Sequence, residues 1–296
     1  MNKHAYLIIA HNEPKILEVL LGLLDDERNE IFLHVDKRSV EVRKQMENIH
    51  LNSASLHILH SPMEVYWGDI SQVLVEYKLF EEAHAVGPFA YYHLLSGVDL
   101  PLKTQTEIHH FFDQHSGKEF VGFWMDAVHQ RDLKRKVCRY HFFTKYFKGG
   151  PRWKHNICAF LRNVSLALQK ILPFSRNQTL ELRKGYHWVS ITNNFCTYLL
   201  DHKEEVLHSF KYTLCPDEIF LQTMLWNSPF KEKIYSLESA SEGSLRAIDW
   251  KRGNPYVWQL ADVDELLASP YLFARKFAGN QYEAVSRIKK VLSDGQ

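Results

Sequence analysis

The chain has few cysteines and no long apolar run. Its 296 residues include four cysteines, and none of them has the CxxC spacing of zinc and redox motifs. This argues against a structural zinc site or a disulfide scaffold and is compatible with a reducing cytoplasm. No segment reaches the roughly 18 uninterrupted apolar residues of a membrane span, and the apolar run at 5–10 is too short for a signal peptide core. We therefore expect a cytoplasmic protein.

Net charge is also nearly absent. Lys and Arg number 36 against 35 Asp and Glu, which leaves +1 and no overall field that would attract nucleic acid. The composition, 45% hydrophobic and 24% charged, is that of a globular protein. The length fits one large α/β domain or a domain with an insertion. We expect a single domain over 1–296 with an insert at about 128–184.

Short apolar runs alternate with amphipathic segments along the chain. Strand-like runs occur at 5–10, 31–35 and 56–59, from Tyr91 onward, and at 186–191. Apolar residues with helical spacing occur at 16–24, 70–80, 194–200, 219–225 and 262–267. Such alternation is typical of a nucleotide-binding, doubly wound sheet. It predicts an α/β fold with a mixed, mostly parallel sheet flanked by helices.

The run that starts at Tyr91 ends at Ser96-Gly97 and then delivers Asp99 and Lys103. Loops at the carboxyl ends of parallel strands are where open α/β sheets bind ligands. Asp99 is followed by Leu-Pro, so no second carboxylate stands two positions on to share a divalent ion. A capping Asp at the end of a buried strand is the alternative interpretation.

The pattern changes between about 128 and 184. Residues 131–154 contain nine basic residues and one acid, Asp132, a local charge of +8, with aromatic residues interleaved. Residues 157–172 then place apolar side chains on one helical face. Three interpretations remain open: a solvated basic face over a core helix, a patch for anionic lipid or a lipid-diphosphate acceptor, and single-stranded nucleic acid. The third is least favoured, because no known nucleic-acid module is present.

Metal binding by histidine is not indicated. The 17 histidines contain no HxxxH pair with a carboxylate partner, and we interpret them as ordinary polar or core residues.

Several blocks in a fixed order carry a resemblance. They are His34-Val35-Asp36-Lys37, Tyr66-Trp67-Gly68, the segment 96–103, Trp188, Pro216-Asp217-Glu218, Asp249-Trp250-Lys251 and the segment 273–277. Through them the chain resembles the core-2/I-branching β-1,6-N-acetylglucosaminyltransferases and peptide O-xylosyltransferases, glycosyltransferase family 14. The resemblance spans roughly 5–278, with 128–180 unmatched. It implies a GT-A-like, Rossmann-type fold and an inverting transferase that works without metal, in agreement with the missing second carboxylate.

The resemblance also implies a catalytic base and a cation for the leaving diphosphate. The base maps onto Glu218, where a helix N-terminus would keep it ionised. Pro216 is expected to hold Cys215 extended, and plain helix capping is the alternative role for the two acids of this turn. The diphosphate-binding lysine maps onto Lys276. The family's diphosphate-binding arginine has no clear counterpart at the same spacing, so we expect Arg252, Arg275 or Arg246 to take its place.

The remaining candidate residues concern the nucleotide and the two sugars. Asp36 is expected to contact uracil or ribose, or else to cap its strand. Tyr66 and Trp67 are each expected to stack on the base or pack beneath it, and packing is favoured for Trp67. Donor or acceptor sugar contacts are assigned to Asp99, Asp217 and Trp250, the last of which could also belong to the core.

Together these features predict a bacterial-type enzyme of surface polysaccharide or glycolipid synthesis, cytoplasmic or peripheral at the inner face of the plasma membrane. The predicted donor is a UDP-sugar, with N-acetylglucosamine ahead of xylose and galactose, and the acceptor is a glycan or a lipid-diphosphate-linked sugar. We expect no metal cofactor and no nucleic-acid partner, and peripheral contact with anionic membrane through 131–172. The alternative is a non-catalytic carbohydrate- or lipid-binding protein on a degenerate transferase fold. The presence of both Glu218 and Lys276 argues against it.

Overall fold

A five-stranded sheet forms the centre of the computed structural model, which describes residues 2–146, 148, 152–171, 176–177 and 179–295. The strand order is β3-β2-β1-β4-β6. The parallel strands are β1 (His4–Ala10), β2 (Asn29–Val35), β3 (Ser55–Ile58) and β4 (Tyr91–Ser96), and β6 (Ser190–Thr192) runs antiparallel to β4. The predicted mixed, mostly parallel sheet is therefore confirmed.

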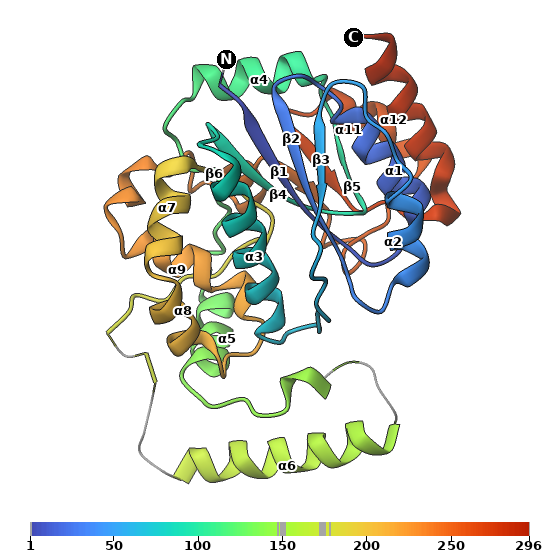
Figure 1. Ribbon diagram of the computed structural model, residues 1–296. Coiled ribbons are helices and arrows are strands. Elements are labelled where there is room, and N and C mark those ends of the chain that lie inside the picture. The colour runs from blue at the N-terminus through green and yellow to red at the C-terminus, as the bar shows by residue number, and fades with distance from the viewer. Residues whose placement is uncertain (1, 147, 149–151, 172–175, 178, 296) are drawn as a thin grey trace.

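Helices cover both faces of this sheet (Figure 1). Alternate residues of β1 point to opposite sides: Tyr6 and Ile8 pack in one apolar core, and Ala5 and Leu7 in another. The first core includes residues of α1 (Pro14–Leu23), α2 (Val40–Met46), α4 (Gln105–Gln114), α11 (Val263–Ala268) and α12 (Tyr282–Asp294). The second includes residues of α3 (Ser71–Val86), α7 (Asn193–Asp201), α8 (Lys203–Phe210) and α9 (Phe220–Trp226). Each fully buried aliphatic side chain contributes about 1.5–3 kcal/mol to this packing.

A second, three-stranded sheet brings the C-terminal segment to the end of β4. Its order is β5 (Asp99–Pro101), β8 (Phe273–Arg275) and β7 (Arg246–Ile248), and the last of these follows the short helix α10 (Ala240–Ser244). β5 and β8 are antiparallel, and their register sets Asp99 opposite Arg275. Two residues that are far apart in the sequence therefore meet beside the carboxyl end of β4.

The strand predicted at 186–191 is shorter than expected, because only its last two residues and Thr192 join the sheet. The backbone just before it makes other bonds. Gly185 N donates to Glu218 O at 2.9 Å, and Trp124 N donates to Lys184 O at 2.8 Å. The segment thus connects the turn that carries Glu218 to the 122–124 loop instead of extending the sheet.

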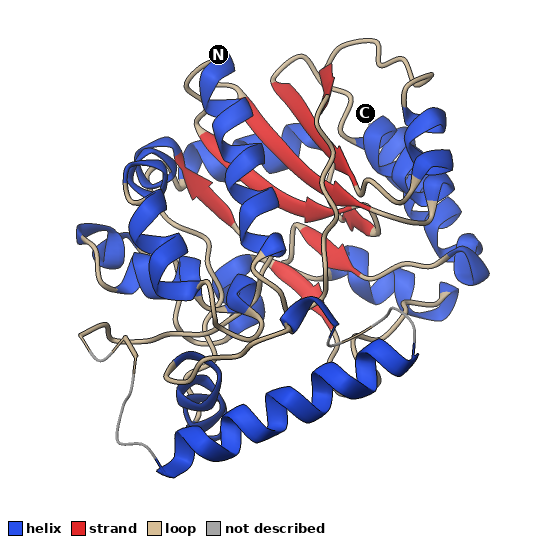
Figure 2. Cartoon of the chain, turned by 60° about the horizontal axis from the view of Figure 1, so that its bottom comes forward, coloured by secondary structure: helices blue, strands red, loops and turns tan. Residues whose placement is uncertain are grey.

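The insert consists of α5 (Ala127–Val137), a 3-10 turn at Thr144–Tyr146 and α6 (Arg152–Ile171). α5 buries Leu133 and Val137, whereas no residue of α6 is buried. The interpretation of 157–172 as a core helix is therefore wrong, and Leu172 lies outside the described residues. Both views place α6 along one edge of the molecule, away from the sheet (Figures 1 and 2). None of the helices in the described part of the chain is both long and apolar enough to cross a membrane.

Candidate active site

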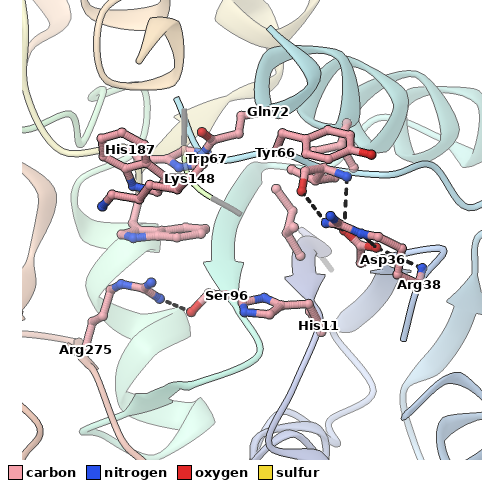
Figure 3. Close-up of a pocket in the computed structure, with 15 residues that line it drawn as sticks. His11, Asp36, Arg38, Tyr66, Trp67, Gln72, Ser96, Lys148, His187 and Arg275 are labelled. Atoms are coloured by element: carbon pink, nitrogen blue, oxygen red, sulfur yellow. Dashed lines mark hydrogen bonds and ion pairs between the residues drawn. The ribbon is translucent and has the colours of Figure 1, made fainter. Parts of the chain in front are cut away.

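A cavity of about 350 Å³ opens at the carboxyl ends of β1, β2 and β4 (Figure 3), and we call it the strand-end cavity. It lies at the point where the chain order of the strands reverses, with β2 on one side of β1 and β4 on the other. Open α/β sheets bind ligands in this position. Its wall includes His11 after β1, Asp36 and Arg38 after β2, Ser96 at the end of β4, and Arg275 of β8.

A second cavity of about 300 Å³ adjoins the first, and we call it the carboxylate cavity. Asp217, Glu218 and Trp250 line it. The two cavities share six lining residues, so they form one continuous site: Trp67, Gln72, Lys148, His187, Trp188 and Arg275.

Asp36 supplies an ionised carboxylate to the strand-end cavity. Its Oδ2 accepts hydrogen bonds from Arg38 Nη2 at 2.7 Å and from Val65 N at 3.0 Å. Burial alone would raise the pKa of this carboxyl, but the hydrogen bonds from Arg38 and Val65 outweigh it and hold the pKa below its usual value. Arg38 and Lys145 lie 4.5 and 4.6 Å from the centre of the Tyr66 ring, whose hydroxyl donates to Glu64.

Trp67 lies at the wall of both cavities and is exposed there. Its side chain is 44% exposed, and Lys148 Nζ lies 3.6 Å from the ring centre. The cause lies in the next residue, Gly68, which has a φ of 72°. A Cβ there would lie 3.3 Å from Cys215 Sγ, and Gly68 O accepts from Cys215 N at 3.0 Å. The chain turns tightly against Cys215 at this glycine, directly after Trp67.

The turn that carries Glu218 differs from the expected helix start. Residues Pro216–Glu218 form a 3-10 turn, and α9 begins only at Phe220. Cys215 is not extended: its φ of 53° lies in the left-handed region, where the bond to Gly68 holds it. The backbone of Glu218 is fixed by Gly185, where a Cβ would come within 1.7 Å of Gly122 O.

Two lysines flank the Glu218 carboxylate. Lys184 Nζ lies 3.2 Å and Lys136 Nζ 3.7 Å from Glu218 Oε2. Asp132 contacts the same two lysines at 3.2 Å. Burial opposes the charge on Lys136, but the adjacent Cys215 and the carboxylates of Glu218 and Asp132 outweigh it and raise the pKa of the lysine. The charge environment of Glu218 therefore comes from side chains more than from a helix dipole.

Asp217 belongs to a buried polar cluster next to Glu218. Its Oδ2 accepts from Gln72 Nε2 at 3.0 Å and lies 3.4 Å from His187 Nδ1, while His187 Nε2 lies 2.9 Å from Glu76 Oε1. Burial, followed by the charges of Glu218 and Glu76, raises the pKa of Asp217 to about 7, although His187 opposes the rise. For His187 burial favours the neutral form, but the two carboxylates outweigh it and raise the pKa. His187 lines both cavities and is thus one of the polar residues of the site.

Arg275, like Lys148, is a cation that lines both cavities. Its Nη1 donates to Asp99 Oδ1 at 2.8 Å and to Ser96 Oγ, and its guanidinium carbon lies 4.6 Å from the centre of the Trp188 ring. Asp99 also accepts from Ser96 N at 2.8 Å. Asp99 lines neither cavity, so the structure does not bring it to a sugar position. Its contacts hold Arg275 in place.

The other candidate cations lie elsewhere. Arg252 pairs with Asp249 at 2.5 Å and with Asp262 at 2.7 Å, and it lines neither of the two joined cavities. It lines a third cavity of about 610 Å³, which shares Tyr186, Ile248 and Trp250 with the carboxylate cavity. Arg246 is buried and donates to Val189 O and Ser190 Oγ. Lys276 is half-buried and lines none of these three cavities.

Sequence reasoning missed Lys148, Lys136 and Lys184 as parts of the site. All three belong to the basic insert, and nothing in its pattern distinguishes them from the neighbouring lysines and arginines. Arg38 could have been found, because it follows the Asp36-Lys37 block directly. Among the described residues, no group of three or more His, Cys, Asp or Glu side chains is arranged to hold a metal ion.

A strand-end cavity at the switch point of a mostly parallel sheet, lined by a carboxylate, aromatic rings and cations, is the arrangement of a ligand-binding α/β domain. The model of the Core-2/I-Branching enzyme family matches residues 4–263, and the chain belongs to that family of glycosyltransferases.

Sequence similarity to individual transferases agrees with this membership. The chain is 24% identical over 255 residues to xylosyltransferase 2 of Canis lupus familiaris, a match that covers 84% of this chain and 26% of that protein. It is 25% identical over 296 residues to the N-acetyllactosaminide beta-1,6-N-acetylglucosaminyl-transferase of Mus musculus, which covers 94% of this chain and 69% of that protein. The chain thus spans only about a quarter of the length of the xylosyltransferases it matches.

Among solved structures, apo mouse xyloside xylosyltransferase 1 aligns with 95% of this chain and 99% of its own. The TM-score is 0.37 and the sequence identity 12%.

Proposed function

We propose that the protein is an inverting glycosyltransferase that moves a sugar from a UDP-sugar to a hydroxyl group of a glycan or lipid-diphosphate-linked acceptor in surface polysaccharide synthesis. We favour N-acetylglucosamine as the transferred sugar and keep xylose as the alternative, because the names of the relatives include both kinds of transfer. The observation that carries the proposal is that the two cavities join at Arg275, with Asp36 in one and Glu218 in the other.

The proposed reaction uses this arrangement in one displacement. The nucleotide occupies the strand-end cavity, and the sugar lies toward the carboxylate cavity. Glu218 takes the proton of the acceptor hydroxyl as its oxygen attacks C1 of the sugar. The bond from C1 to the diphosphate oxygen breaks, and its electron pair stays on that oxygen. Attack from the opposite face inverts the configuration at C1.

Cationic side chains are proposed to meet the charge that develops on the leaving diphosphate. Arg275 and Lys148 line both cavities, which supports this role for the two side chains. Lys276, which follows Arg275 directly, is retained from the family resemblance as a further cation. Since these side chains can supply the positive charge, we propose that the reaction needs no metal ion.

The proposal is tested by measuring UDP release from UDP-N-acetylglucosamine, UDP-xylose and UDP-galactose with a panel of hydroxyl acceptors, with and without EDTA. We expect turnover of one donor well above the others, and the same rate in EDTA. A rate that EDTA abolishes and manganese restores would contradict the metal-free part. UDP binding measured by calorimetry without turnover of any donor would instead support the non-catalytic alternative.

A further inference from the structure

Helix α6 turns its polar side toward the rest of the molecule. Gln169 Nε2 donates to Tyr140 O at 2.9 Å, and Gln169 Oε1 accepts from Tyr140 N at 2.8 Å. Near the other end of the helix, His155 Nδ1 donates to Tyr146 O at 3.1 Å. Arg162, on the same side, lines a cavity between α6 and α5. The hydrogen bonds that position this helix are therefore made by its polar side chains, and Leu166 and Ala167 line the cavity beside them.

The opposite side of α6 is apolar and exposed. Its large side chains are between 42% and 79% exposed: Trp153, Ile157, Phe160, Leu161, Val164, Leu168 and Ile171. Their spacing of three and four residues places them on one stripe. Helices on the surface of a soluble domain normally turn such a stripe inward, and a continuous apolar stripe facing outward marks an interaction surface. Both views agree that the helix lies at the edge of the molecule (Figures 1 and 2).

The charge around this stripe has one sign. No Asp or Glu occurs between Asp132 and Glu181. Lys154 and Lys170 are exposed on the two flanks of the stripe. The cavity of about 450 Å³ between α5 and α6 is lined by Arg135, Arg139, Arg162 and Lys170 and by no carboxylate, although Arg135 pairs with Asp132 beside it.

We propose that α6 is an interfacial helix that lies on an anionic lipid bilayer, with its apolar stripe among the acyl chains and its flanking cations at the head groups. Apolar side chains next to lysine and arginine, in a segment without acids, match both parts of such a surface. Each cation near an anionic surface adds only about 1 kcal/mol, so the binding is reversible and depends on salt.

This position would bring the active site close to the membrane. Lys148 lines both cavities, and Arg152 begins α6 four positions later. Four residues of extended chain span at most about 14 Å. A lipid-linked acceptor could therefore reach the carboxylate cavity from the same surface. The membrane proposal itself does not depend on the enzymatic one, because lipid binding is measured without substrate.

The test is co-sedimentation of the whole chain with vesicles of phosphatidylglycerol and phosphatidylcholine, and with vesicles of phosphatidylcholine alone, at low and high salt. We expect binding to the anionic vesicles at low salt and little to the neutral ones. Trp153→Ser combined with Phe160→Ser should lower the partition coefficient at least about tenfold through lost apolar burial. Lys154→Gln combined with Lys170→Gln should lower it about fivefold per charge.

A matched control changes two exposed lysines of α12, Lys289→Gln with Lys290→Gln, and should leave binding unchanged. Circular dichroism shows whether each variant is folded. Equal binding to neutral and anionic vesicles, or no binding to either, would overturn the proposal. Sedimentation equilibrium without lipid tests whether a second copy of the chain binds the stripe instead of lipid. Self-association that the Trp153 and Phe160 changes abolish would assign the stripe to a second copy of the chain and would also overturn it.

Discussion

The joined cavities and helix α6 arrange polar and apolar side chains in opposite ways. At the cavities, half-buried charged groups pair with buried ones, such as Arg275 with Asp99 and Glu218 with Lys184. In α6, the apolar side chains are exposed, and the polar ones form the contacts with the body. The first arrangement forms a polar site within the fold, and the second leaves an apolar surface that a binding partner can contact.

The comparison teaches that amphipathic periodicity and burial are separate facts. The apolar stripes of α1 and α12 pack in the core, as the usual rule predicts. α6 has a stripe of the same kind that faces solvent. A sequence pattern defines the two sides of a helix, and only the tertiary structure decides which side turns inward.

The largest effect should follow from the proposed base. Glu218→Gln removes the proton acceptor but keeps the shape of the side chain, so we expect kcat for UDP release to fall about 10²–10⁴-fold. Binding of UDP, measured by calorimetry, should stay the same. Glu283→Gln, an exposed change on α12, is the control. A Glu218→Gln enzyme that keeps half its activity would show that Glu218 is not the catalytic base.

The next prediction concerns the pH dependence of stability. It depends on buried acids outside α6, because α6 contains no Asp or Glu. Glu119 is fully buried, with its two oxygens accepting from the backbone N and hydroxyl of Thr192. Burial raises the pKa of Glu119 to about 7, although these hydrogen bonds oppose the rise. The folded state therefore holds a proton that the unfolded state releases near pH 4.3. The stabilisation is complete below that pH and is lost as pH rises toward about 7.

Glu119→Gln should remove this loss, which is on the order of 2–3 kcal/mol. The measurement is urea unfolding between pH 4.5 and 7.5. Asp217 and His187 also have raised pKa values, and their contributions have the same sign, so part of the slope should remain in the variant. An unchanged slope would show that Glu119 does not titrate in this range.

Two of the three candidate arginines, Arg275 and Arg252, offer a matched pair. Arg275→Gln removes a charged group from both cavities, and we expect kcat/KM to fall about 10–100-fold, as for the loss of a hydrogen bond to a charged group. Arg252→Gln should have little effect, because Arg252 is paired with Asp249 and Asp262 outside the two cavities. The same UDP-release assay measures both. The reverse ranking would move the diphosphate site to the cavity lined by Arg252.

The central part of the fold could be predicted because its signals are local. The segments 5–10 and 31–35 are apolar except for His34, as strands buried on both faces largely are, and both are strands in the structure. β6 was predicted too long, because backbone bonds of 184–185 to other loops were not visible in the pattern. α12 could have been found, since Ala284, Ile288 and Leu292 are spaced by four residues.

The candidate site could be predicted where a motif carries both the residue and its position. Glu218 and Asp217 line one cavity and Asp36 and Tyr66 the other. Asp99 could not be placed, because the register of β5 against β8 turns it toward Arg275. The choice among the arginines likewise depends on which acids lie nearby in space, and the sequence does not contain that information.

The smallest effect should come from α6 itself, tested with two residues of the same type. Phe160 in α6 is 67% exposed, whereas Phe120 is fully buried, with its ring 4.9 Å from that of Phe112 and 4.7 Å from that of Tyr235. Phe120→Ala should lower the free energy of unfolding by about 3–5 kcal/mol, because it leaves a cavity in the core. Phe160→Ala should change it by no more than about 0.5 kcal/mol, because its ring packs against little in the monomer.

Urea unfolding without lipid measures both values, at two protein concentrations. A loss above about 2 kcal/mol for Phe160→Ala would mean that the apolar stripe is covered, since exposed positions rarely cost so much. If that loss grew with protein concentration, a second copy of the chain would be covering it. If it did not, α6 would pack against its own body, and the contrast between the buried site and the outward-facing helix would no longer hold.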